Sequence, residues 1–449
     1  MIEPAGLEER VRAFAARRTP GGEGGRVVLA ASGGADSTAM IGLLCSAGLI
    51  APGAALVAHF DPRLRGEDAA GRDLAAVEEL CALVDLPLET GAWDAPARGE
   101  AAAREARYRF LGNVAARAAA IAVVTGHTLD DQVETVMLNT LRGAGPYGLA
   151  GMAADAPWPL GGGGPRVLRP LLDVERAETR AYCAARGLRY VDDPSNDDPS
   201  FRRNRVRREL MSQLDATPDA RRVVVAMADR TRESIDALER ATAHALLADV
   251  DGIVRLSRDA LREMTRELAP YAYRQALRAL AGDAREFSRR HYELMAGASE
   301  GRTGSMLRLP RGVVLTVDPD AVLLSLGELR VAAIDEGAEY PLPFAGPVGA
   351  WSLEIVETDG DRDASTIVAP AGAVVRGRRP GDRLQPRGMT GHKKLQDYYV
   401  DRKVPHRERD AAPVIACGTD VLWTPYGVAA EATSGRWWQV SARRAALPE

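Results

Sequence analysis

The stretch SGGADS at residues 32 to 37 brings together two glycines, two hydroxyl groups and one carboxylate directly after an apolar run. Gly33 and Gly34 lack Cβ atoms, so an anion can approach the main chain closely, and the two serines can add hydroxyl donors. A carboxylate repels phosphate unless a cation lies between them, so Asp36 predicts Mg²⁺ that bridges to a nucleotide. An ordinary helix cap explains this turn equally well on its own. The expected nucleotide contacts are Ser32, Gly33, Gly34, Ala35, Asp36 and Ser37.

A second cluster, HTLDDQVET at residues 127 to 135, offers an imidazole and several carboxylates. A helix that starts within this cluster places Asp131 and Glu134 three residues apart on one face. Such a pair could hold Mg²⁺ or receive an ammonium group, and His127 could contact phosphate or position a proton. Acidic residues in a first helical turn also suit the helix dipole, so for Asp130 a capping role and a chemical role stay equally open.

Strands that alternate with helices must position these two clusters. The strands are expected at residues 27–30, 56–60, 86–88 and 121–125. Their alternation with helices predicts an α/β fold with a parallel, Rossmann-like sheet, in which ligands bind at the carboxyl ends of the strands. Both clusters fall at such ends, and so does His59, which joins the expected nucleotide contacts.

The remaining chain predicts two further domains. Residues 219 to 300 have apolar residues at helical spacing, and residues 306 to 326 have the pattern of a small β-meander. In the β-rich region that follows, Trp423, Trp437 and Trp438 are expected in the core, which we favour over stacking on bases. The expected domains are a catalytic domain at 1–215, a helical middle domain at 216–335 and a β-rich C-terminal domain at 336–449.

Composition limits the class of protein. The chain has 449 residues, ordinary hydrophobic and charged fractions and a net charge of −4, so any nucleic-acid role must rest on local basic patches. Two such patches lie at residues 202–208 and 376–409, and all three lysines of the chain lie in the second. No apolar run could span a membrane, and the four cysteines lack the spacing of a metal site or a disulfide framework. A cytoplasmic protein without a membrane partner is therefore expected.

Five motifs, in order, resemble those of one family. SGGADS resembles the SGGxDS signature of the PP-loop ATP pyrophosphatases. Together with HTLDDQVET, LRGAGPYGLAGM, RPLLDV and DDPSNDDPSFRRNRVR, it makes residues 27 to 208 resemble the tRNA(Ile)-lysidine synthetase family. Residues 375 to 404, VRGRRPGDRLQPRGMTGHKKLQDYYVDRKV, resemble the C-terminal domain of that family. One departure is Pro62, which stands where the family commonly has a second histidine near the nucleotide.

The resemblance implies an enzyme that uses ATP, Mg²⁺ and free L-lysine to modify the wobble cytidine of tRNA(Ile) with a CAU anticodon. In the family, O2 of the cytosine attacks the α-phosphate, pyrophosphate leaves, and the lysine ε-amine then displaces AMP at C2. The resulting lysidine changes codon reading from AUG to AUA. The implied catalytic residues are Asp36, His127, Asp131, Glu134 and Arg107, the last within AREARYRF. The expected tRNA contacts are Arg203, Asn204, Arg207, Lys393, Lys394, Arg402 and Lys403.

Three other classes of protein are disfavoured. A tRNA thiolase would need reactive or cluster-binding cysteines, and an amidating synthetase would need a glutaminase domain. A tRNA-binding protein without catalysis would have lost parts of SGGADS or HTLDDQVET, and both are intact. The sequence leaves the oligomeric state open, a homodimer included, and does not divide lysine and metal between Asp131 and Glu134.

Overall fold

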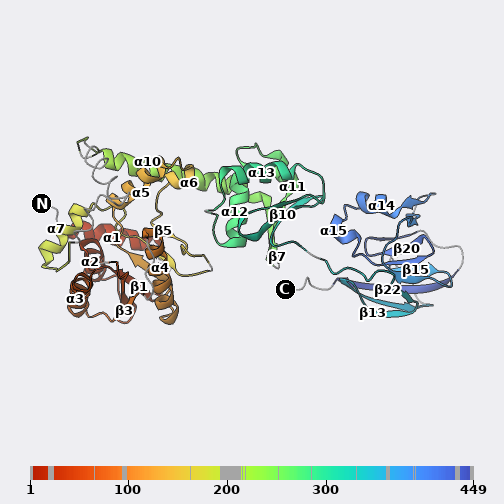
Figure 1. The fold of residues 1–449 in the computed structure, drawn as a ribbon, viewed down its shortest axis with the longest axis horizontal. Coiled ribbons are helices and arrows are strands. Elements are labelled where there is room, and N and C mark those ends of the chain that lie inside the picture. The colour runs from red at the N-terminus through yellow and green to blue at the C-terminus, as the bar shows by residue number, and fades with distance from the viewer. Residues whose placement is uncertain are drawn as a thin grey trace. The chain divides into compact units, whose positions relative to one another are not determined.

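The computed structural model describes residues 4–18, 25–64, 66–93, 99–161, 163–192, 214, 216–217, 219–250, 252–284, 286–329, 331–359, 365–387, 389, 391–429 and 435–444. The chain forms two compact units, residues 1–237 and residues 238–449 (Figure 1). The domain boundaries expected after residues 215 and 335 stay predictions.

A six-stranded sheet forms the centre of the first unit. Its strands are β1 (Val27–Ala31), β2 (Ala55–Asp61), β3 (Leu88–Ala92), β4 (Ala122–Thr125), β5 (Asp155–Ala156) and β6 (Arg166–Leu168). They lie in the order β3-β2-β1-β4-β6-β5, and only the β5–β6 pair is antiparallel. The parallel Rossmann-like sheet is therefore confirmed. The third strand begins at Leu88 rather than Leu86, because Pro87 has no N–H group to donate to a strand ladder.

Helices cover both faces of this sheet. They are α1 (Pro4–Arg18), α2 (Ala35–Ser46), α3 (Glu67–Val84), α4 (Glu100–Arg117) and α7 (Arg176–Arg186). Neighbouring side chains of a strand point to opposite faces. Leu29 therefore packs in one cluster with residues of α1, α2, α3 and α7, while Val28 packs in another with residues of α4. Three further helices belong to this part of the chain: α5 (Leu129–Leu141) and α6 (Pro146–Leu149) lie between β4 and β5, and α10 (Ala220–Thr242) follows α7.

The second unit begins with helices on a five-stranded antiparallel sheet. Its strands are β7 (Leu246–Val250), β8 (Ile253–Ser257), β9 (Met306–Arg308), β10 (Val313–Val317) and β11 (Ala321–Leu326), in the order β7-β8-β11-β10-β9. Its helices are α11 (Arg258–Glu263), α12 (Ala269–Ala281) and α13 (Arg289–Ser299). The meander expected at 306–326 is present, but the helix expected to reach Leu247 ends at Thr242 and the β7–β8 hairpin follows. The Asp-Gly pair at 251–252, between two alternating apolar runs, is a hairpin signal that this expectation overlooked.

The C-terminal part of the second unit is β-rich, as expected. One sheet contains β12 (Glu339–Pro341), β16 (Val374–Arg376), β17 (Arg383–Leu384), β18 (Lys393–Lys394), β19 (Val414–Cys417), β20 (Asp420–Thr424) and β21 (Gly427–Val428). The other contains β13 (Phe344–Val348), β14 (Trp351–Glu357), β15 (Thr366–Ala369) and β22 (Arg436–Arg444), and two short helices are α14 (Leu395–Asp401) and α15 (His406–Arg409). Trp423 and Trp438 are buried in the core between these strands, whereas Trp437 is partly exposed.

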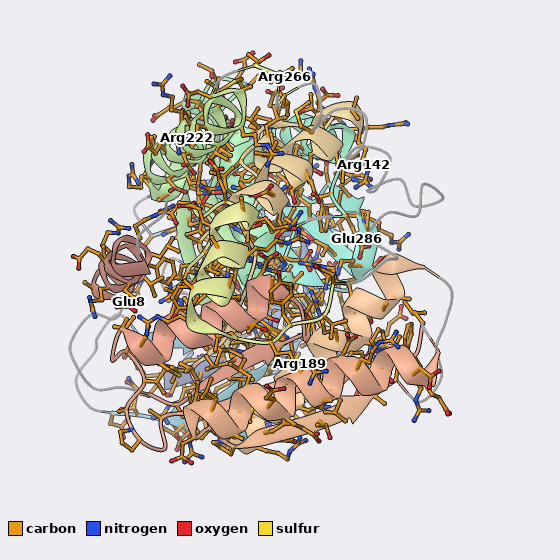
Figure 2. The ribbon with its side chains drawn as sticks, turned by 90° about the vertical axis from the view of Figure 1, so that its left-hand side faces the viewer. Glu8, Arg142, Arg189, Arg222, Arg266 and Glu286 are labelled. Atoms are coloured by element: carbon orange, nitrogen blue, oxygen red, sulfur yellow. The ribbon has the colours of Figure 1, made fainter. Side chains whose placement is uncertain are left out.

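Several charged side chains of the first unit are exposed. In Figure 2, Arg142, Arg189 and Arg222 are labelled examples, and all three are exposed. Within the described part of the chain, no helix has the length and apolar character needed to cross a membrane.

Gly126, which follows β4, gives a test of how closely the segment after β4 packs against the start of α2. A Cβ atom at this position would lie 2.8 Å from the carbonyl oxygen of Asp36 and 2.9 Å from the nitrogen of Ser37. We predict that Gly126→Ala lowers the free energy of unfolding by about 1–3 kcal/mol, measured by chemical denaturation of the whole chain. Gly71→Ala in α3 is the matched control, because its Cβ would meet nothing within 4 Å. It should be neutral or stabilising by up to about 1 kcal/mol. Equal stability of the two variants would contradict this account.

Candidate functional site

The two chemical clusters meet where the order of the strands reverses. After β1 the chain passes to β2 on one side, while β4 pairs with β1 on the other, so that Ala30 lies beside Thr125. Such a switch point leaves a crevice at the carboxyl ends of the two strands, and open α/β sheets bind ligands there. The turn before α2 and the turn before α5 both lie at this position.

The turn before α2 is held in shape by its own serines. The N–H of Ser32 donates to Oγ of Ser37 at 3.1 Å, the two hydroxyl oxygens lie 3.1 Å apart, and Oγ of Ser37 donates to the carbonyl of Gly34 at 3.0 Å. Gly33 has a φ of +84°, and a Cβ there would lie 2.9 Å from the carbonyl oxygen of Asp73. The turn therefore requires glycine at this position, and it aims the first N–H groups of α2 away from the helix, as an anion site needs.

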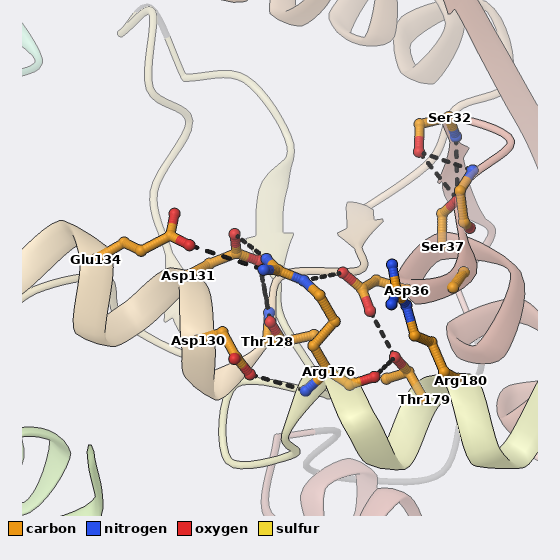
Figure 3. A network of polar contacts seen from close by, with 12 residues as sticks. Ser32, Asp36, Ser37, Thr128, Asp130, Asp131, Glu134, Arg176, Thr179 and Arg180 are labelled. Carbon is orange, nitrogen blue, oxygen red and sulfur yellow. Dashed lines mark hydrogen bonds and ion pairs between the residues drawn. The ribbon is translucent and has the colours of Figure 1, made fainter. Parts of the chain in front are cut away.

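One arginine joins the carboxylates of both clusters (Figure 3). Nε of Arg176 lies 3.2 Å from Oδ2 of Asp36, Nη2 lies 3.1 Å from Oδ1 of Asp131, and Nη1 lies 3.7 Å from Oε1 of Glu134. Oγ1 of Thr179, one turn further along α7, donates to the other oxygen of Asp36 at 2.5 Å. Carboxylates from α2 and α5 thus converge on the first turn of α7.

The three acids of α5 have different surroundings. Oδ2 of Asp131 accepts the N–H of Thr128 at 3.0 Å, so this residue caps its own helix while its other oxygen contacts Arg176. Asp130 accepts the main-chain N–H of Arg176 at 2.7 Å and pairs with Arg221. The capping alternative therefore holds for Asp130, although the helix that it caps is α7 rather than its own. The Glu134 side chain is only 1% exposed, so its charge depends on a buried partner.

Burial and ion pairing act against each other in this network. Burial raises the pKa of Asp36, and the hydrogen bond from Thr179 and the charge of Arg176 only partly offset this effect. Burial alone would lower the pKa of Arg176, but Asp131, Asp36 and Glu134 raise it above its ordinary value. The guanidinium therefore stays charged, and it offsets part of the effect of burial on the charged form of Asp36.

A second group of cations lies close to Tyr108 of α4. The guanidinium carbon of Arg104 lies 4.9 Å from the centre of the Tyr108 ring, and that of Arg107 lies 5.5 Å from it. Burial would raise the pKa of Tyr108, but Arg104, Arg107 and Arg169 together lower it. Arg169 is 6% exposed, and its Nη1 donates to the carbonyl of Ala153 at 2.7 Å. Such a concentration of positive charge suits a phosphate or carboxylate ligand.

His127 lies beside this group of cations and is held by β4. Its Nδ1 lies 2.8 Å from Oγ1 of Thr125. Burial lowers its pKa to about 3; Asp131 opposes this shift, whereas Arg169 and Arg107 add to it. A neutral imidazole can accept or donate a hydrogen bond but brings no positive charge to a phosphate. Of the two roles expected for His127, a phosphate contact would therefore be a hydrogen bond without an ion pair, and positioning a proton stays open.

His59 differs from the other expected nucleotide contacts. It is 5% exposed, and its Nδ1 lies 3.1 Å from the carbonyl oxygen of Ala31, at the end of β1. This contact supports the strand that carries the phosphate turn. A direct role toward the nucleotide stays a prediction.

The expected tRNA contacts divide into two sets. Arg203, Asn204 and Arg207 lie outside the described residues. In the second unit, Lys394, Arg402 and Lys403 are exposed, whereas Lys393 forms an ion pair with Asp401. Arg402 also lies over the ring of Tyr398, with its guanidinium carbon 5.3 Å from the ring centre.

Within the basic patch expected from Arg376 to Arg409, several arginines have acidic partners, and the role of the patch in tRNA binding stays a prediction. Arg376 is 2% exposed and binds Asp382 through two hydrogen bonds of 2.8 and 2.9 Å. Acids beyond the basic run account for most of the remaining pairs. These pairs are Arg378 with Asp410, Arg379 with Glu339, Arg383 with Asp420, and Arg407 with Asp318. The many arginines of this stretch are evident in the sequence, but the acids that pair with them come from other segments and are brought close only by the fold.

Sequence reasoning missed Arg176 and Thr179. Both lie in the helix that follows RPLLDV, but among many arginines nothing marked this one. The one signal in the sequence was the position of Arg176 at the start of a helix. The residue before it, Glu175, is the N-cap of this helix but not one of the residue types usually preferred there.

A metal ion fits the site only together with a nucleotide. The described residues contain no group of three or more histidine, cysteine, aspartate or glutamate side chains placed to hold a metal. Mg²⁺ is commonly bound through one or two carboxylates plus substrate phosphates and water. Asp36, at the N-terminus of α2, fits that kind of binding.

Comparisons with known proteins show the family of the chain. Residues 7–214 match the PP-loop domain family, and residues 373–442 match the TilS substrate C-terminal domain family. A tRNA(Ile)-lysidine synthase of Geobacter sulfurreducens is 34% identical over 442 residues, covering 92% of this chain and 91% of its own. One of Symbiobacterium thermophilum is 36% identical over 467 residues, covering 93% of each chain.

The pKa of His127 gives a test of the site's electrostatics. With a pKa of about 3 in the folded chain, this imidazole should not titrate between about pH 5 and 8. Proton and carbon NMR of histidine-labelled protein should therefore contain one imidazole signal that stays constant over this range and is missing in His127→Gln. In the unfolded chain His127 takes up a proton near pH 6.5, whereas in the folded chain it does so only near pH 3. The free energy of unfolding therefore decreases as pH falls below about 6.5.

The exposed His392 provides the control, since His392→Gln should remove a different signal and leave the constant one in place. A titration midpoint between pH 5 and 8 for the signal of His127 would show that the ring is solvated.

Proposed function

Since the chain belongs to the tRNA(Ile)-lysidine synthase family, we propose that it joins free L-lysine to C2 of the wobble cytidine of tRNA(Ile) with a CAU anticodon. The reaction consumes ATP and yields AMP, pyrophosphate and lysidine. The modified anticodon reads AUA instead of AUG, and the tRNA gains isoleucine in place of methionine identity.

The observation that carries this proposal is the ion pairing of Arg176. Its guanidinium contacts Asp36, which lies at the phosphate turn, and also Asp131 and Glu134, which suit an ammonium group. A site for a nucleotide and a site for a cationic amine therefore share one boundary. A ligase that activates one substrate with ATP and attacks it with an amine needs this arrangement.

In the first step, O2 of the cytosine attacks the α-phosphorus, the bond to the β-phosphate oxygen breaks, and pyrophosphate leaves. This transfer depends on positioning and on neutralising the charge of the phosphates. In this proposal the N–H groups at the start of α2 and the guanidinium of Arg107 do both. Mg²⁺, held through Asp36 and the phosphates, would supply further positive charge when bound.

In the second step, the lysine ε-amine attacks C2, the C2–O bond breaks, and AMP leaves. The amine arrives as an ammonium ion and must lose a proton before it attacks. Asp131 or Glu134 binds the ammonium group and accepts this proton. Neutral His127, hydrogen-bonded to Thr125, positions the phosphate or the leaving group without adding charge.

Selection of the tRNA falls to other parts of the chain. Arg203, Asn204 and Arg207 would follow the phosphate backbone, and Lys394, Arg402 and Lys403 form the exposed basic part of the second unit. The proposal includes a reaction in the cytoplasm, where tRNA, lysine and ATP are present, and leaves a homodimer open.

The direct test is to incubate the purified chain with ATP, Mg²⁺, radiolabelled lysine and unmodified tRNA(Ile) bearing CAU. We expect label in the tRNA and one pyrophosphate per lysine incorporated. The same tRNA with a UAU anticodon is the control and should take up no label. Folded protein that transfers no lysine to the CAU tRNA would exclude the proposed function.

Asp36→Ala separates chemistry from tRNA binding. Loss of this carboxylate should lower pyrophosphate release by about 100-fold or more, because one charged group at a phosphate in transfer is commonly worth that much. Affinity for tRNA, measured by filter binding, should not change. Asp68→Ala, on the exposed first turn of α3, is the matched control and should retain activity. If Asp36→Ala also loses tRNA binding, then Asp36 is structural.

Two neighbouring lysines offer a graded test of the basic surface. Lys394 is exposed, whereas Lys393 is paired with Asp401, so only the first is free to contact a phosphate. Lys394→Ala should weaken tRNA binding and reduce the slope of log affinity against log salt by about 1. Lys393→Ala should have a smaller effect on both. Unchanged affinity and slope for Lys394→Ala would mean that this lysine is a solvated surface residue.

A further inference from the structure

Arg176 lies where the lysine ammonium group would have to bind. Its side chain is 24% exposed and lies within ion-pair distance of three carboxylates. Two of them, Asp131 and Glu134, are the acids proposed above to receive the substrate amine. A guanidinium and an ammonium group that share the same two acids compete for them and repel each other.

The phosphates of a bound nucleotide are an alternative partner for the same guanidinium. Its Nε lies 3.2 Å from Asp36, the second residue of α2, so the charge lies at the helix end where a triphosphate would bind. Phosphate oxygens are strong acceptors for a guanidinium, which can bind them through two N–H groups. A triphosphate on this turn would therefore compete with Asp131 and Glu134 for the guanidinium.

Charge balance favours the same exchange. Three carboxylates contact the guanidinium of Arg176, and the neighbouring Asp130 pairs with Arg221. The Glu134 side chain is nearly fully buried, and a buried carboxylate that loses its cation is costly. If Arg176 moves toward the phosphates, Asp131 and Glu134 lose their contacts with its guanidinium. The ammonium group of a bound lysine can then take its place beside these two carboxylates.

We propose that Arg176 is a positioning residue that couples the two substrates: it competes with lysine for Asp131 and Glu134 until ATP draws its guanidinium toward the phosphates. Lysine therefore binds weakly alone and tightly after ATP. By thermodynamic linkage, lysine raises the affinity for ATP by the same factor. This inference rests on the proposed function, because it takes lysine and ATP as the ligands.

The test is calorimetric titration of the full chain with L-lysine, with and without a saturating ATP analogue that carries a methylene group between its α- and β-phosphorus atoms, in the presence of Mg²⁺. We expect the analogue to lower the lysine Kd of the unaltered chain by about tenfold or more. In Arg176→Gln, lysine should bind more tightly than in the unaltered chain when the analogue is absent, and the ratio of the two Kd values should fall to within about twofold. A residue needed only for structure would change lysine affinity in the opposite direction.

Two further variants keep the test decisive. Arg176→Lys retains a cation and should restore part of the coupling. Arg186→Gln, on the same helix, removes an exposed ion pair with Glu8 far from the carboxylates and should behave as the unaltered chain. Binding of the analogue and a thermal transition establish that each variant is folded.

The outcomes separate the two proposals. Lysine binding that is equally coupled to the analogue in the unaltered chain and in Arg176→Gln overturns the role of Arg176 alone, as does tight lysine binding to the unaltered chain without the analogue. No lysine binding to the unaltered chain under either condition overturns the proposed function as well.

Discussion

Three carboxylates can lie side by side in a partly buried site only if a cation lies among them, and the organisation of the first unit follows from this constraint. Asp36, Asp131 and Glu134 come from helices that start at the ends of β1 and β4, and Arg176 comes from a third helix. Asp130 fixes the start of that third helix by accepting its first N–H. The ion pairs of Arg176 therefore connect it with Asp36, 140 residues away, and with Asp131, 45 residues away. The two carboxylates are adjacent because the strand order reverses between β1 and β4.

Much of this could be predicted from the sequence, because it depends on local patterns. Alternating apolar strands and helices predict the parallel sheet, and a switch point predicts that SGGADS and HTLDDQVET meet. Asp130 could not be assigned, because its partner is a main-chain N–H 46 residues further along the chain. Arg176 was missed for a related reason: its role depends on which carboxylates converge on it, and no spacing along α7 reveals that.

The second unit shows that a local run of basic residues does not reveal which of them have acidic partners. A run of arginines near Arg376 predicts a phosphate-binding surface, yet Arg376 is buried in a two-bond ion pair with Asp382 and several neighbours have acidic partners. A buried guanidinium bound on both sides organises a loop and is not available to RNA. The net charge of −4 is consistent with this pairing, since the chain carries more acids than bases.

The scarcity of lysine has a practical consequence for labelling chemistry. All three lysines lie within residues 393–403, and Lys394 and Lys403 are exposed there. Apart from the terminal amine, an amine-reactive fluorophore would therefore mark one small region of the second unit and leave the first unit unmodified. A reagent that is usually indiscriminate becomes regioselective on this chain, and fluorescence anisotropy could follow events at this region without a designed cysteine.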